Sequence, residues 1–176
     1  MNSDDGFLQV LATDPTDDVT RLIYADWLDE RNDPRGQYLR LELELWQRVE
    51  SGGVFPGLEE RLAALRLSID PEWLNQAGIK CNVRLHSCQP TAKISAIRVL
   101  RAELNCGLVE AKQLVDTRRS LLLGATSLER ALRLQRLLQV IPWTFPAPTL
   151  PSGWVPGVGP ACEVRINRYR LPASTS

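Results

Sequence analysis

Apolar side chains recur at three- and four-residue steps through residues 1–78, and this spacing predicts a run of short helices. We expect helices over residues 4–13, between Asp14 and Asn32, over residues 35–49 and from Leu58 onward, with breaks where proline and glycine fall. The apolar face expected for the second helix consists of Val19, Leu22, Ile23, Trp27 and Leu28.

The pattern changes after Gly78. Residues 81–87 alternate, with Cys81, Val83 and Leu85 on one side, which predicts a half-buried strand. Two helices follow within residues 93–116, then an extended segment over residues 120–125 and an apolar helix from Ser127. Residues 161–169 alternate again and predict a closing strand with Cys162, Val164 and Ile166 inward.

Within residues 93–116, KISAIRVLRAELNCGLVEAKQLVD, spacing and charge point to one surface. We expect the first helix to bury Ile94, Ile97, Leu100 and Leu104, with Lys93, Arg98 and Arg101 mostly off that face. Gly107 is expected to end this helix in a left-handed cap. The second helix then begins with Leu108, Ala111, Leu114 and Val115 and carries Glu110 and Lys112 outward.

This segment resembles, without a gap, the helix-turn-helix core of the carboxy-terminal domain of the bacterial ribosomal stalk protein. The matching positions are Lys93, Ile94, Ser95, Ile97, Arg98, Arg101, Gly107, Glu110, Ala111 and Lys112. That family docks translational GTPases on this face, so the resemblance implies a protein-docking surface and no catalysis. It also implies an α+β fold: after an all-helical N-terminal module comes a small three-stranded antiparallel sheet covered on one face by three helices.

The N-terminal segment RLIYADWLDERNDPRGQYLRLELEL resembles the small bacterial repeat-companion domain. Members of that family occur in proteins next to leucine-rich and other interaction repeats. The matching positions are Arg21, Tyr24, Ala25, Asp26, Trp27, Leu28, Glu30, Asp33, Pro34, Arg35, Arg40 and Leu41. We expect Asp26 to have a structural role, in which it accepts hydrogen bonds from Arg21 or from an arginine of the third helix; we call this contact the polar lock. A ligand or partner site and a catalytic carboxylate are the weaker alternatives.

The chain also departs from the stalk protein. Residues 142–160, PWTFPAPTLPSGWVPGVGP, stand where a connection of a few residues is expected, and loops of this length often have a function. Trp143, Phe145 and Trp154 are expected either to pack against the acidic N-terminal module or to form a partner-binding lip. The stalk protein's own dimerisation region and hinge have no counterpart, which argues against membership of the ribosome.

The charge is divided unevenly along the 176 residues. Residues 1–78 have seven basic and sixteen acidic side chains, a net charge of −9, whereas residues 79–176 have fourteen and five, a net charge of +9. We therefore expect a module over 1–78, a second over 79–170 with an insertion at 142–160, and a tail over 171–176. No secretory signal and no membrane-spanning run is visible, so we expect a cytoplasmic protein without a membrane partner.

Candidate chemistry is sparse. The cysteines Cys81, Cys88, Cys106 and Cys162 and the single His86 lack metal-ligand spacing, so we expect free buried thiols, no metal and no cofactor. A disulfide between Cys81 and Cys162 is the alternative, because their strands could be neighbours. With no phosphate loop and no nucleophile elbow, we expect no enzymatic activity.

The leading hypothesis is therefore a non-enzymatic interaction or adaptor protein. Its basic helix face would receive a protein partner with an acidic or amphipathic surface, around Ile94 and Ile97. The alternative is nucleic-acid binding by the basic C-terminal half, through Arg118, Arg119, Arg130, Arg133 and Arg136. A plain solvated helix face also fits the pattern. The sequence does not fix the oligomeric state.

Overall fold

The structure is a computed structural model that describes residues 3–52, 57–140 and 160–172. The chain forms two compact units: unit 1 comprises residues 1–81, 125–129 and 168–176, and unit 2 comprises residues 82–124 and 130–167. Unit 1 has a net charge of −7 and unit 2 a net charge of +7. The charge asymmetry expected from the sequence is therefore also present between the two compact units.

The described residues form eight α-helices, one 3-10 turn and three strands, which confirms the expected α+β class. In chain order they are α1 (Ser3–Thr13), α2 (Asp18–Asp29), α3 (Pro34–Glu50), α4 (Leu58–Arg66), α5 (Pro71–Ala77), β1 (Lys80–Cys88), η1 (Pro90–Ala92), α6 (Lys93–Leu104), α7 (Leu108–Asp116), β2 (Ser120–Ser127), α8 (Leu128–Gln139) and β3 (Cys162–Arg168). No helix within these described ranges has both the length and the apolar character needed to cross a bilayer.

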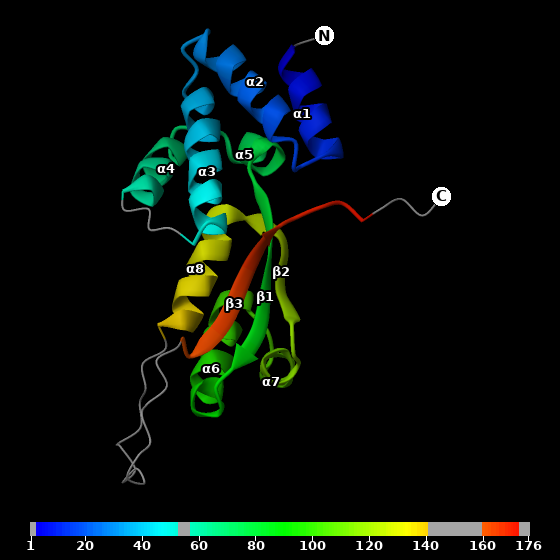
Figure 1. Ribbon diagram of the computed structural model, residues 1–176, viewed down its shortest axis with the longest axis vertical. Helices are drawn as coiled ribbons and strands as arrows, with labels where there is room; N and C mark the ends of the chain where they lie inside the picture. Colours follow the sequence, from blue (N-terminus) through cyan, green and yellow to red (C-terminus); the bar gives the residue numbers. More distant parts are fainter. Residues whose placement is uncertain (1–2, 53–56, 141–159, 173–176) are drawn as a thin grey trace. The chain divides into compact units, whose positions relative to one another are not determined.

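The three strands form one antiparallel sheet in the order β2-β1-β3, and α6, α7 and α8 cover one of its faces (Figure 1). Its covered face presents Val83 and Leu85 of β1 and Val164 of β3, all buried. The helices bury small and medium apolar side chains against them, among them Ala96, Leu100, Ala111, Val115, Leu132 and Leu138. The architecture implied by the stalk-protein resemblance is therefore confirmed.

The pairing of β1 with β3 contains one extra residue on the β1 side. The Tyr169 N–H donates to the Lys80 carbonyl at 2.9 Å, and the Gln89 N–H donates to the Ala161 carbonyl at 3.0 Å. Nine steps along β1 thus match eight along β3, which is the signature of a β-bulge. The bulge reverses the alternation near the end of β1, and Cys88 consequently lies beside Cys162.

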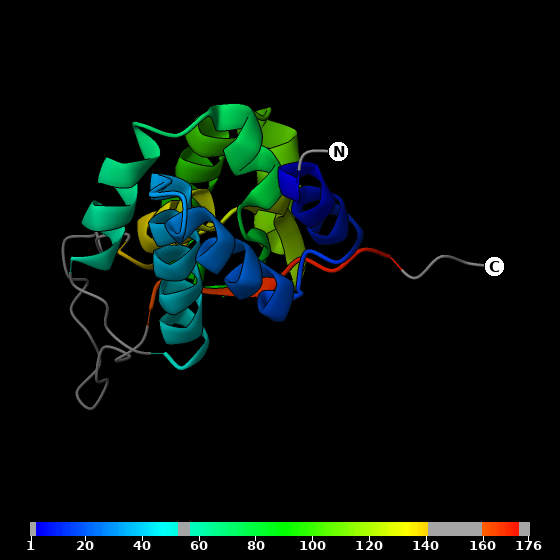
Figure 2. The same cartoon turned by 90° about the horizontal axis from the view of Figure 1, so that it is seen from above.

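Helices α2 and α3 lie side by side in unit 1 (Figure 1 and Figure 2). The face predicted for α2 is right for Leu28, which is buried, but wrong for Val19 and Ile23, which are 69% and 53% exposed. The residues that α2 buries are Arg21, Tyr24, Ala25 and Leu28. A charged residue at a core position cannot be recognised from hydrophobic spacing, and this arginine shifts the buried face away from the apolar residues.

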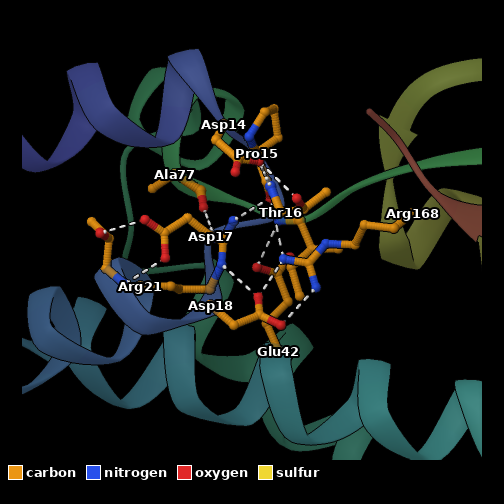
Figure 3. A network of polar contacts seen from close by, with 11 residues as sticks. Asp14, Pro15, Thr16, Asp17, Asp18, Arg21, Glu42, Ala77 and Arg168 are labelled. Atoms are coloured by element: carbon orange, nitrogen blue, oxygen red, sulfur yellow. Dashed lines mark hydrogen bonds and ion pairs between the residues drawn. The ribbon is translucent and has the colours of Figure 1, made fainter. Parts of the chain in front are cut away.

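The buried arginine belongs to a polar network at the centre of unit 1 (Figure 3). Arg21, 1% exposed, donates through Nη1 to the Ala77 carbonyl and through Nη2 to the Pro15 carbonyl, the latter at 3.1 Å. Glu42 of α3, 2% exposed, accepts from the Ile79 N–H at 2.9 Å and from the Tyr38 hydroxyl at 3.2 Å. Burial raises the pKa of Glu42, and the positive charge of Arg21 opposes that shift.

A second arginine joins this network from the far end of the chain. Arg168, the last residue of β3, donates through Nη2 to Asp18 Oδ1 at 2.6 Å and to the Pro15 carbonyl at 3.2 Å. Its guanidinium also lies over the ring of Trp46, 5.6 Å from the ring centre. Arg21 and Arg168 thus share the Pro15 carbonyl as an acceptor, and one set of hydrogen bonds joins residues from both ends of the chain within unit 1.

Replacing Glu42 should show how strongly unit 1 depends on this network. Glu42→Ala removes the buried carboxylate whose charge favours the Arg21 cation and leaves the half-exposed Asp18, at 3.8 Å, as the ion-pair partner of Arg21. It also leaves the Ile79 N–H without its acceptor, so the free energy of unfolding should fall by about 3–5 kcal/mol. Urea denaturation followed by tryptophan fluorescence measures this. The matched control Glu44→Ala removes an exposed carboxylate paired with Arg48 at 2.7 Å and should cost less than about 1 kcal/mol. Equal losses in the two variants would contradict the account.

Candidate protein-docking site

Helix α6 buries Ala96 and Leu100, and the η1 turn before it buries Ala92. Ala96 and Leu100 are fully buried and Ala92 nearly so, and these three residues recur at four-residue steps. The prediction that Ile94 is buried is wrong, because its side chain is 68% exposed. The small Ala96 thus occupies the inward side of the helix while the larger Ile94 lies outside, whereas hydrophobic size alone suggested the opposite orientation.

The outward side of α6 combines an apolar residue with two arginines. Ile94, Arg98 and Arg101 are spaced by four and three residues and therefore lie along one side of the helix. Arg98 and Arg101 are exposed, and neither forms an ion pair with a described residue. Ser95 and Ile97 are half-buried at the margins of this stripe. We call Ile94, Ile97, Arg98 and Arg101 the α6 stripe.

The turn between α6 and α7 differs in detail from the prediction. Asn105, and not Gly107, adopts the left-handed conformation that ends α6, with a φ of 51°. Gly107 has a φ of −69° and instead precedes α7 as its N-cap residue. Asparagine is the residue that tolerates this conformation best after glycine, so the local chemistry is satisfied in either case.

Helix α7 exposes apolar side chains, and the expectation that Leu108 belongs to its buried face is wrong. Leu108 and Val109 in its first turn are 58% and 71% exposed, whereas Ala111 and Val115 are buried. Glu110 and Lys112 are exposed as expected. Lys112 lies one turn beyond Leu108 and Val109, so α7 also carries a positive charge next to exposed apolar side chains.

Lys93 differs from the other basic residues of α6 and α7 because it forms an ion pair. Its Nζ lies 2.5 Å from Asp116 Oδ1, so the ion pair joins the first residue of α6 to the last residue of α7. This hydrogen bond raises the pKa of Lys93 and lowers the pKa of Asp116. Lys93 therefore contributes less free positive charge than Arg98 and Arg101.

Two arginines of α8 contact Glu103 of α6. Arg133 Nη2 lies 3.0 Å from Glu103 Oε1, and Arg130 donates to the Glu103 carbonyl at 3.4 Å. Arg136 likewise takes part in an interaction. A phosphate backbone would have to compete with these contacts, which makes α8 a weaker candidate than α6 for binding a charged partner.

The conspicuous residues of the N-terminal motif form contacts inside unit 1. Arg40 of α3 donates from Nε to Asp29 Oδ2 at 3.0 Å and from Nη2 to Asp26 Oδ1. The expected polar lock between Asp26 and an arginine of the third helix is therefore present, and the donor is Arg40 rather than Arg21. Asp33 caps α3 and accepts from the guanidinium of Arg35.

Tyr24 lies among other aromatic side chains. Its ring stacks on Phe7 at 4.7 Å between centres, its hydroxyl donates to Asp4, and the Trp73 indole N–H donates to the same hydroxyl at 2.9 Å. Burial and then the hydrogen bond to Asp4 raise the pKa of Tyr24. Trp73, Asp4 and Arg35 also line a pocket of about 690 Å³ in unit 1, where Arg35 pairs with Asp4 and Asp33.

The remaining candidates from the sequence are the cysteines, the histidine and the aromatic residues of residues 142–160. Within the described ranges, no three His, Cys, Asp or Glu side chains come together to hold a metal ion. Cys81 and Cys162 are buried free thiols and form no disulfide with each other, while Cys88 and Cys106 are only partly buried. Trp143, Phe145 and Trp154 lie outside the described residues.

Comparison with protein families identifies one part of the chain. Residues 81–140 match the model of the ribosomal protein L7/L12 C-terminal domain. This match covers the segment from β1 through α8 and confirms the stalk-type resemblance for that segment. It does not extend to the N-terminal helices, whose likeness to the repeat-companion domain stays a prediction. Comparisons with curated proteins and with solved structures gave no significant match.

The corrected turn geometry can be tested by substitution. Asn105→Val forces a β-branched residue into the left-handed region and should lower the free energy of unfolding by about 1–3 kcal/mol. Asn105→Gly should be nearly neutral, because glycine adopts this conformation without steric cost. Gly107→Ala should also be tolerated, because no atom lies within 4 Å of the added methyl group. Urea denaturation of the three variants measures this; strong destabilisation by Gly107→Ala alone would contradict the assignment.

Proposed function

We propose that this protein is a non-enzymatic docking module and that the outward side of α6 and α7 binds a protein partner. One observation carries the proposal: an exposed isoleucine, Ile94, lies in line with two arginines that have no described ion-pair partner. It stands in a segment that matches a domain of the ribosomal stalk. An exposed apolar residue in line with two cations is poorly explained by packing within unit 2.

The chemistry of this surface indicates the kind of partner. Apolar contacts at Ile94, with Leu108 and Val109 on the adjoining helix, would supply most of the affinity once water is excluded from them. Arg98, Arg101 and Lys112 would speed the encounter with an acidic surface and fix its orientation. The partner is therefore an acidic or amphipathic protein surface, such as a helix with carboxylates flanking an apolar stripe.

The stalk-type resemblance makes translational GTPases the first partners to test. The N-terminal helices stand where the stalk protein has its dimerisation region and hinge. The protein would thus present a stalk-type docking surface from a different helical module, as an adaptor does. Nucleic acid is a weaker candidate for the main partner, because Arg130 and Arg133 already donate hydrogen bonds to Glu103.

Reversing the free charges should abolish docking without unfolding the protein. We expect the double variant Arg98→Glu, Arg101→Glu to bind its partner at least about tenfold more weakly at low salt, because attraction becomes repulsion. The full chain, immobilised, is offered a purified translational GTPase and, separately, cell lysate whose retained proteins are identified by mass spectrometry. Circular dichroism establishes that the variant is folded.

The matched control is the double variant Arg61→Glu, Arg118→Glu, which changes the net charge equally at exposed positions outside α6 and α7. It should retain the partner. Equal losses in both double variants would mean that only the overall charge matters. Retention of the partner by the Arg98→Glu, Arg101→Glu variant would refute the proposed site, and nuclease-sensitive retention would favour the nucleic-acid alternative.

The apolar and charged residues should act on different rate constants. Ile94→Ala should leave the free energy of unfolding within about 0.5 kcal/mol of the original, since the side chain is exposed, yet should raise the dissociation rate. Arg98→Gln should chiefly lower the association rate. This effect should disappear near 1 M salt, because the Debye length falls to about 3 Å and the charge no longer attracts a distant partner. Surface plasmon resonance at several salt concentrations separates the two. Wild-type kinetics in both variants would exclude the α6 stripe.

A further inference from the structure

Two thiols that are 74 residues apart in the sequence meet at one end of the sheet in unit 2. Cys162 Sγ lies 3.0 Å from Cys88 Sγ, and both are free thiols. The β-bulge described above explains the meeting. Strict alternation from Cys81 would turn Cys88 to the opposite face of the sheet from Val83 and Leu85. The extra residue returns it to the side of Cys162.

The geometry suits a disulfide better than a bound metal. Cys88 and Cys162 are flanked by the hydrogen-bonded pair Gln89 and Ala161, so they occupy a neighbouring non-hydrogen-bonded position. Cα atoms at such positions are about 4.5 Å apart, which falls within the range that a disulfide spans. Two thiolates on one tetrahedral zinc ion would be separated by about 3.8 Å, from Zn–S bonds of about 2.3 Å. Here the sulfurs are closer.

The two thiols have unequal surroundings. Cys88 is partly exposed, and the hydrogen bond from Cys162, followed by the nearby Lys93 ammonium, lowers its pKa. Cys162 is fully buried, and its position as the donor to Cys88, together with burial, raises its pKa. Cys88 is therefore the thiol that an oxidant can reach, and it is the better nucleophile. Cys162 is the adjacent thiol that can react with an oxidised Cys88.

We propose that Cys88 and Cys162 form a reversible oxidation site, in which a hydroperoxide converts the adjacent thiols to an intramolecular disulfide. The Cys88 thiolate attacks the peroxide, the O–O bond breaks, and Cys88 becomes a sulfenic acid while an alcohol or water leaves. Cys162 Sγ then attacks Cys88 Sγ and releases water. Two thiols thus lose two electrons and two protons, and the peroxide takes up both.

The oxidised link joins the end of β1 to the start of β3 and closes a loop that contains α6, α7, β2 and α8. The disulfide would thus join residues 88 and 162 covalently and restrict the unfolded chain between them. The site is independent of docking, because it rests on the sheet and not on the outward side of α6. Its test therefore does not depend on finding a partner.

The test uses the full chain, reduced, freed of reductant and treated with a small excess of hydrogen peroxide at neutral pH. Free thiols are alkylated in denaturant and counted by mass spectrometry. We expect the number of free thiols to fall from four to two with loss of two hydrogens, peptide mapping to link residues 88 and 162, and dithiothreitol to restore all four. Cys162→Ser should accumulate a sulfenic acid at Cys88 that dimedone traps.

The control is Cys106→Ser, which removes another partly buried thiol of unit 2 and should form the same link as the wild type. Cys88→Ser should form no intramolecular disulfide. A link to Cys81 or Cys106, a disulfide between two chains, or a wild type that goes to sulfinic acid at Cys88 while Cys162 stays a thiol would overturn the proposal.

Discussion

Burial of the Glu42 carboxylate is the constraint on which the organisation of unit 1 depends. A carboxylate out of water must be matched by donors and counter-charge, and here they come from Ile79, Tyr38 and Arg21. Arg21 in turn takes its hydrogen bonds from the Ala77 and Pro15 carbonyls. The helices α2, α3 and α5 are thereby fixed at the residues that lead into β1, and Arg168 fixes the return from β3 through Asp18.

In unit 2 the determining feature is which residues α6 buries. Ala96 and Leu100 bring the helix onto the sheet, and the larger Ile94 faces outward beside Arg98 and Arg101. Packing within the domain thus leaves apolar surface and positive charge where a partner can reach them. The same segment matches the stalk-type family model, although fold alone does not identify a partner.

Hydrophobic spacing and motif resemblance predicted the antiparallel sheet under three helices and the order of the other elements, except for the short α5 and η1. They could not predict where charge is buried, because Arg21 and Glu42 look like surface residues until their partners are known. They also misjudged Ile94 and Val19, since apolar spacing cannot tell an outward face from an inward one when alanines or an arginine occupy the core side. The bulge that brings Cys88 to Cys162 breaks strand alternation, so it too was missed.

The docking surface is tested most directly by amide chemical-shift mapping of the isotope-labelled full chain, titrated with a partner retained in the capture experiment. The account predicts that the largest changes fall within residues 93–101 and 108–112, and that those changes vanish in the Arg98→Glu, Arg101→Glu variant. Changes concentrated in α2, in residues 118–136 or in residues 141–159, with α6 and α7 unaffected, would contradict it.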